Sequence, residues 1–158
     1  MRILGVDPGS VTMGYGVIDA EPLSLVAFGV LRARASSPLE SRLLSLFRKL
    51  EEVFELYRPA VVAVEEPFVA ANPRSALAVG RAQAVALLLA AREGLPLHRY
   101  PPARVRQQVT GYGGGDKLQV QEMVRMLLGL KEAPQPHDAA DALAVAICHM
   151  LLGRRAQP

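Results

Sequence analysis

The chain has 158 residues, of which 51% are hydrophobic and 21% are charged. These values exclude a disordered chain and favour a single domain, residues 1–158, with a buried core. The lone cysteine, Cys148, excludes an internal disulfide and a four-cysteine zinc site. We find no signal peptide and no apolar run long enough to span a membrane, and therefore expect a cytoplasmic protein with no membrane partner. A net charge of +3 is compatible with nucleic-acid binding but does not require it.

Three strands are predicted in the first third of the chain, over Arg2–Val6, Gly14–Ile18 and Leu23–Leu31. The connections between them are short, which favours an antiparallel meander.

Helices and strands alternate in the rest of the chain. Ser37 is expected to cap a first helix, with Pro38 in its first helical position and Pro59 beyond its end. The following elements are predicted to be strand Ala60–Val64, helix Pro73–Glu93, strand Leu95–Tyr100, helix Asp116–Leu128 and helix His137–Leu152, which Gly153 would end. Asn72-Pro73 marks the start of the second predicted helix in the chain, and Asp116 is the expected cap of the third. This order predicts an α/β fold, a mixed five-stranded sheet flanked by helices.

The helix predicted over Pro73–Glu93 is apolar around nearly its whole circumference. Such a helix must be covered on more than one side. The sheet can cover one side, and a second subunit is the simplest cover for the other. A central helix sandwiched within one subunit is the alternative.

Four acidic residues lie at the ends of predicted core strands or at the start of the last predicted helix. Asp7 follows the first strand, Glu65 follows strand Ala60–Val64, and Asp138 and Asp141 open the last helix three residues apart, on one face. Buried charges must be paired, protonated or metal-bound, and no lysine or arginine adjoins Asp7 in the sequence. Converging carboxylates bind Mg²⁺ or Mn²⁺, and two such ions can clamp a phosphodiester for attack by water.

Each aspartate also has an ordinary structural interpretation. Asp7 could initiate the turn at Pro8-Gly9. Asp138 could cap the last helix, and Asp141 could be favoured by the helix dipole. These alternatives remain open for each residue taken singly.

Three motifs carry a family resemblance: ILGVDPG at residues 3–9 with GYG at 14–16, Glu65 with Phe68, and DAADALA at residues 138–144. In this order and spacing they resemble the RuvC Holliday junction resolvases over essentially the full chain. The resemblance implies an RNase H-like fold and a homodimer that nicks two symmetric strands of a four-way DNA junction in recombination and repair. It further implies that Asp7, Glu65, Asp138 and Asp141 are the catalytic residues.

The resemblance also implies cofactors and partners. The four carboxylates would bind two Mg²⁺ ions per active site, with Mn²⁺ as a substitute, whereas Glu66 would be a bystander. The branch-migration proteins RuvA and RuvB are the expected protein partners.

Candidate DNA contacts surround these motifs. Phe68 matches an aromatic position of the family and is expected to stack on a base, although a core position is the alternative. Arg74, Arg106 and Lys117 are expected to hold phosphates. The glycine-rich stretch at residues 111–115 is expected to be a flexible loop that orders on DNA.

Other functions compete with this interpretation. A second RNase H-like nuclease acting on structured RNA would also begin with an aspartate and glycines. An actin-like phosphotransferase has a similar first motif but needs two domains. A non-enzymatic DNA-binding module would have no use for four convergent acids, which repel phosphate unless a metal is present.

Overall fold

The structure, a computed structural model, describes residues 1–67 and 72–155. Within these residues the chain forms five strands and five helices. In chain order they are β1 (Arg2–Asp7), β2 (Thr12–Ala20), β3 (Leu23–Arg32), α1 (Leu39–Tyr57), β4 (Val61–Glu65), α2 (Pro73–Arg92), β5 (Leu97–Tyr100), α3 (Pro102–Thr110), α4 (Lys117–Leu127) and α5 (His137–Arg155).

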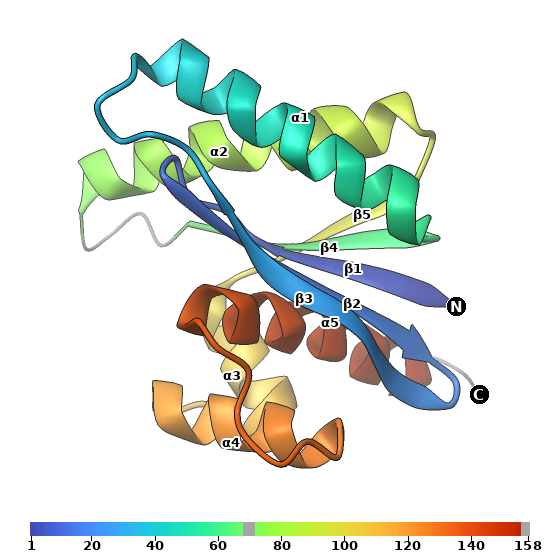
Figure 1. The fold of residues 1–158 in the computed structure, drawn as a ribbon. Helices are drawn as coiled ribbons and strands as arrows, with labels where there is room; N and C mark the ends of the chain where they lie inside the picture. The colour runs from blue at the N-terminus through green and yellow to red at the C-terminus, as the bar shows by residue number, and fades with distance from the viewer. Residues whose placement is uncertain (68–71, 156–158) are drawn as a thin grey trace.

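The strands form one mixed sheet in the order β3-β2-β1-β4-β5. The first three strands pair antiparallel as a meander, whereas β4 runs parallel to both β1 and β5. Helices α1 and α2 cover one face of this sheet, and α5 with α3 and α4 covers the other (Figure 1). The predicted five-stranded α/β architecture is therefore confirmed.

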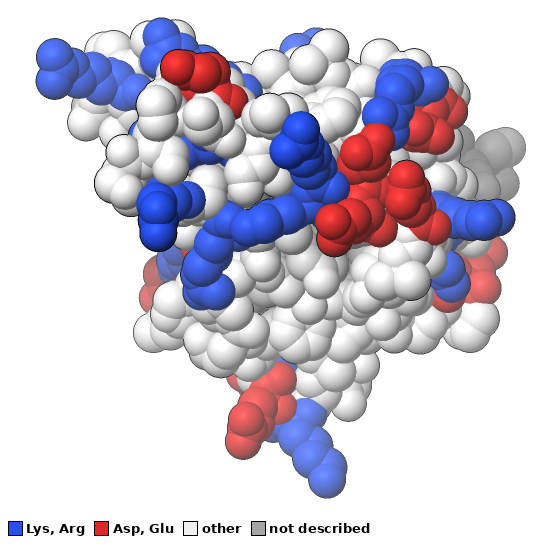
Figure 2. All heavy atoms as spheres, turned by 45° about the horizontal axis from the view of Figure 1, so that its top comes forward, with Lys and Arg blue, Asp and Glu red and all other residues white. Residues whose placement is uncertain are grey.

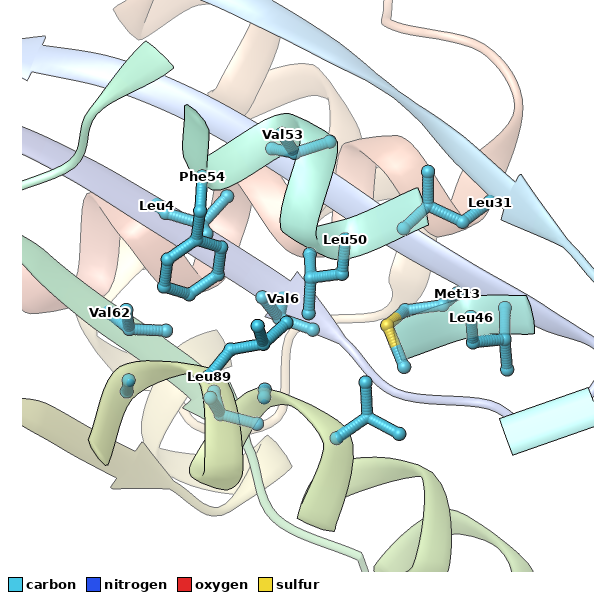
Figure 3. Packing of buried hydrophobic residues seen from close by; sticks show 14 of the residues in the cluster. Leu4, Val6, Met13, Leu31, Leu46, Leu50, Val53, Phe54, Val62 and Leu89 are labelled. Atoms are coloured by element: carbon cyan, nitrogen blue, oxygen red, sulfur yellow. The ribbon is translucent and has the colours of Figure 1, made fainter. Parts of the chain in front are cut away.

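The central strand β1 is buried on both faces, which divides the core in two. Leu4 and Val6 point toward α1 and α2, where they pack with residues such as Leu50 and Leu89 (Figure 3). Ile3 points to the opposite face and packs in the cluster around α5. A strand between two helical layers needs apolar residues on both faces, which explains its continuous apolar run.

Two helix boundaries differ from the sequence-based expectation. Helix α1 begins at Leu39 with Pro38 as its N-cap and without a side-chain cap, so the prediction of Ser37 as the cap is wrong. Instead, the Arg42 guanidinium donates to the Ser37 carbonyl oxygen at 3.0 Å. Helix α5 continues through Gly153 to Arg155, and Arg154 donates to the Ala20 carbonyl oxygen at 2.9 Å.

Between Leu95 and Glu132, one helix was missed and one strand is shorter than predicted. Strand β5 begins at Leu97, because the Leu95 amide donates to the Ala90 carbonyl in the turn that ends α2. Helix α3 was not predicted at all, since only three of its nine residues are buried and it offers little periodicity. The predicted start of α2 at Asn72-Pro73 is confirmed, with Asn72 as its N-cap. Asp116 caps α4 as predicted, and it does so within a capping box formed with Gln119.

Helix α2 is buried on one side only. Ala82, Val85 and Leu89 pack into the core, whereas Leu77 and Leu88 are 54% and 61% exposed. By length and composition this helix could also cross a membrane, a weak criterion that core helices of soluble proteins meet too.

The solvent surface of α1 and α2 carries charges of both signs. Acidic and basic side chains lie next to one another on this side of the molecule (Figure 2). Arg92 of α2 pairs with Glu51 of α1 at 2.6 Å and with Glu93 at 3.0 Å. The first of these pairs links the two helices, whereas the second lies within the end of α2, and surface ion pairs of this kind contribute little to stability.

Candidate active site

The sheet topology brings two of the predicted carboxylates together. Asp7 is the last residue of β1 and Glu65 is the last residue of β4. The two strands are parallel neighbours, and Val6 pairs with Val64 just before the two acids. Because carboxyl ends of adjacent parallel strands lie at one edge of a sheet, Asp7 and Glu65 meet there.

Helix α5 supplies the other two carboxylates because glycines in the sheet let it approach closely. In the antiparallel register Gly14 lies opposite Asp7, and a Cβ on Gly14 would overlap the backbone carbonyl of Asp138. A Cβ on Gly5 would likewise overlap the carbonyl of Ala142. Glycine at both positions therefore lets the first turns of α5 lie directly on the strands beside Asp7.

Asp7, Asp138 and Asp141 form a compact group of oxygen ligands. One carboxylate oxygen from each lies within 4.8 Å of the others. Three acids converging at this distance suit a hard divalent cation, for which carboxylate oxygens are the preferred ligands. Glu65 adjoins the group and interacts with both Asp7 and Asp141.

The electrostatics of the group also favour binding of a cation. Burial raises the pKa of Asp7, and repulsion by Glu65, Asp141 and Asp138 raises it further. Burial and repulsion by Asp141 likewise raise the pKa of Glu65. Carboxylates that resist ionisation together are poised to bind a cation, which would stabilise their charged forms.

Basic side chains from α3 and α4 line the same space. Two adjoining hollows of about 320 and 290 Å³ share Glu65, Lys117 and Asp141 in their walls. We call these hollows the acidic cleft. The Lys117 ammonium pairs with the Asp141 carboxylate at 3.1 Å, and Arg106 lines the larger hollow. The cleft thus places positive charge beside the carboxylates, where a phosphate could be held.

Two buried glutamines support the cleft and were missed by the sequence analysis. Gln83 of α2 donates to the backbone oxygen of Glu65 at 3.3 Å. The Gln121 side chain of α4 lies 2.8 Å from Nδ1 of His137, the residue before Asp138. Little in the sequence indicates this role, because a single glutamine within a helix is usually an ordinary surface residue.

The remaining predicted residues lie in different surroundings. Glu66 also lines the smaller hollow of the acidic cleft, but its carboxylate faces Arg99, with their charged atoms 3.8 Å apart, and it is not part of the three-aspartate group. Arg74 is exposed on the first turn of α2 and lines neither hollow of the acidic cleft. Phe68 lies outside the described residues.

Comparison with known proteins identifies close relatives of the whole chain. A family model described as crossover junction endodeoxyribonuclease RuvC matches residues 3–149. A relative of that name from Dehalococcoides mccartyi is 56% identical over 151 residues, which cover 94% of this chain and 92% of the relative. Another from Thermomicrobium roseum is 49% identical over 158 residues, covering 99% and 97%.

Solved structures give the same result. T. thermophilus RuvC in complex with Holliday junction substrate matches with a TM-score of 0.91 and 37% identity, covering 98% of this chain and 96% of that chain. The yeast mitochondrial Holliday junction resolvase Ydc2 matches with a TM-score of 0.68 at 17% identity, which supports the RNase H-like fold alone. The relatives are named as DNA endonucleases, and this disfavours the structured-RNA alternative.

Proposed function

Because the chain belongs to the RuvC family of crossover junction endodeoxyribonucleases, we propose that it resolves four-way DNA junctions by paired, symmetric nicks during recombination and repair. The observation that carries this proposal is the convergence of acids from β1, β4 and α5 in one cleft with basic residues in its wall. The reaction is hydrolysis of a phosphodiester bond in each of two strands.

The four carboxylates, Asp7, Glu65, Asp138 and Asp141, would hold the metal of this nuclease family. Their oxygens fit Mg²⁺, two ions per active site, with Mn²⁺ as a substitute. When bound, the metal would lower the pKa of a water and neutralise charge on the phosphate. The raised pKa values of Asp7 and Glu65 fit this assignment, because they reflect negative charge without a cation.

Basic and aromatic side chains would position the DNA. Lys117 and Arg106 stand in the wall of the acidic cleft and would hold phosphates next to the cleaved bond. The Lys117 ammonium, which pairs with Asp141, would be able to turn to a phosphate if a metal held that carboxylate. Arg74 would contact DNA farther from the cleft, and Phe68 would stack on a base at the crossover.

Symmetric cleavage of two strands requires two active sites held at a fixed separation. A two-fold homodimer supplies this, and the exposed side of α2 is our candidate interface. We place the enzyme in the cytoplasm, acting as a single nuclease domain over residues 1–158, with the branch-migration proteins RuvA and RuvB as partners.

A cleavage assay tests the proposal directly. The wild-type protein should cut a mobile synthetic four-way junction in Mg²⁺, and EDTA should stop the reaction. Asp7→Asn should bind the junction as tightly as the wild type but should not cut it, since one ligand charge is lost while phosphate contacts remain. Efficient cutting of structured RNA in place of the junction, or cleavage by Asp7→Asn at the wild-type rate, would refute the assignment.

A further inference from the structure

The turn between α3 and α4 presents an aromatic side chain to solvent. Tyr112, within the glycine-rich stretch, is 66% exposed. Its backbone is nevertheless fixed, because its amide donates to the Thr110 hydroxyl at 3.1 Å and its carbonyl accepts from the Gly115 amide at 3.2 Å. The same hydroxyl lies 2.7 Å from the Tyr112 carbonyl oxygen. The tyrosine is therefore held outward by a hydrogen-bonded turn.

The ring of Tyr112 rests on the backbone of Gly114. A Cβ at Gly114 would lie 2.7 Å from both Cζ and the hydroxyl oxygen of Tyr112. Glycine at this position makes room for the ring, and the residue stays largely exposed to solvent. An aromatic ring held in this way can receive a planar ligand at a small cost in side-chain entropy.

The turn that carries Tyr112 leads directly into the wall of the acidic cleft. Gly115, whose amide donates to the Tyr112 carbonyl, lines the larger hollow. The next two residues, Asp116 and Lys117, line it too, together with Glu65 and Asp141. An exposed aromatic side chain in the same short segment as a cation that can hold phosphate is a combination by which proteins bind unpaired nucleotides.

We infer that Tyr112 stacks on a nucleobase of the DNA strand that enters the acidic cleft, and so helps to select junctions over continuous duplex. This inference rests on the proposed function. At a crossover the continuous stack of bases is interrupted, so a base there is easier to unstack than a base within a duplex. A stacking surface beside the cleft would therefore gain affinity at a junction and little on a duplex.

Binding measurements without cleavage test the inference. In Mg²⁺ and in the Asp7→Asn background, which should bind without cutting, Tyr112→Ala should weaken binding of a four-way junction about tenfold, yet leave binding of a duplex of the same length unchanged. Tyr112→Phe should retain the wild-type affinity, because it keeps the ring. The control is Leu56→Ala, which removes an exposed apolar side chain from α1 on the other face of the sheet and should change neither affinity.

Three outcomes would overturn the inference. They are unchanged junction binding by Tyr112→Ala, an equal loss on junction and duplex, and an equal loss in Tyr112→Phe, which would assign binding to the hydroxyl. If the wild type neither binds nor cuts junctions, the proposed function fails instead. If it does both and Tyr112→Ala keeps full affinity, only the stacking inference fails.

Fluorescence provides a second measurement, because the chain contains no tryptophan. Tyr112→Trp would introduce a single indole in the position of the phenol ring, and stacking on a base should quench its emission when the junction is added. Leu56→Trp, on α1, should show no quenching. Emission from Tyr112→Trp that stays unchanged at a junction concentration that saturates binding would contradict the inference.

Discussion

At the scale of single residues, the neighbours Glu65 and Glu66 allow a matched test of the active site. Glu65 adjoins Asp7 in the acidic cleft, whereas Glu66, which lines the smaller hollow too, directs its carboxylate to Arg99. We expect Glu65→Gln to lower single-turnover cleavage of a junction by about a thousandfold, because a ligand charge is lost. Glu66→Gln should stay within about threefold of the wild type, as expected for a surface ion pair. Equal losses in both variants would contradict the assignment of Glu65.

The same carboxylates should make the metal-free protein less stable as the pH rises. Burial and mutual repulsion raise the pKa values of Asp7 and Glu65 in the folded state above those in the unfolded chain, where carboxyl groups titrate near about pH 4. The folded state then binds more protons, so its free energy of unfolding falls as the pH rises from that value through the raised pKa values.

Thermal unfolding in EDTA should therefore show a midpoint that decreases from about pH 5 to about pH 8. Adding Mg²⁺ should raise the midpoint most at the higher pH, where fewer protons compete with the metal for the carboxylates. Asp7→Asn should flatten the profile and stabilise the metal-free protein by about 1–3 kcal/mol at the higher pH, because it removes a carboxyl group that must take up a proton to be buried. A midpoint that rises with pH in EDTA would contradict this account.

At the scale of elements, the close packing of α5 against β1 and β2 depends on glycine. We expect Gly5→Ala to destabilise the protein by about 1–3 kcal/mol, because the new methyl group must displace the backbone of α5 at Ala142. It should also impair cleavage, since Asp138 and Asp141 move with the helix. Denaturant unfolding and the junction assay measure these two effects.

A second glycine, on α5 itself, gives the control. Around Gly153, no heavy atom of the described residues lies within 4 Å of the position of a Cβ, apart from its chain neighbours and its own helix backbone. Gly153→Ala should leave cleavage unchanged and stabilise the helix by up to about 1 kcal/mol. Similar destabilisation by both substitutions would argue against a close-approach role for Gly5.

Helices and strands could be predicted from the sequence where their buried residues form a continuous apolar run or recur with a helical period. Strands β1 and β4 appear as apolar runs, and the Asn72-Pro73 and Asp116 signals mark the starts of α2 and α4 correctly. Helix α3 could not be predicted because so little of it is buried. The prediction of Ser37 as N-cap failed because Pro38 occupies the N-cap position and the helix begins one residue later, at Leu39. The Ser37 carbonyl oxygen instead accepts a hydrogen bond from the Arg42 guanidinium.

The candidate site was partly predictable for a related reason. Acids at the ends of apolar strands are conspicuous in a sequence, so Asp7 and Glu65 could be chosen before their geometry was known. The pairing of Lys117 with Asp141 and the support of Glu65 by Gln83 depend on how distant helices pack. Such contacts leave no local pattern in the sequence.

At the scale of the whole molecule, the outer side of α2 exposes apolar side chains that a second subunit could bury. Leu77 and Leu88 are exposed there, eleven positions or about three helical turns apart. On Gly80, between them, a Cβ would meet no heavy atom of the described residues within 4 Å, apart from its chain neighbours and its own helix backbone. A small residue between two apolar ones would let the equivalent helix of a second copy approach closely, as the proposed homodimer requires.

Gly80→Leu and Leu88→Glu should both weaken this dimer, the first by bulk and the second by placing a charge in an apolar contact. Sedimentation at micromolar concentration should give twice the 17.0 kDa chain mass for the wild type and the chain mass for the variants. Leu56→Glu, at an exposed leucine of α1, is the matched control and should sediment as the wild type does. On a plasmid carrying a cruciform, loss of the dimer should replace linear product with nicked circles, because the two strands are no longer cut together. A wild-type monomer that makes linear product would disprove both the interface and its role in paired cleavage.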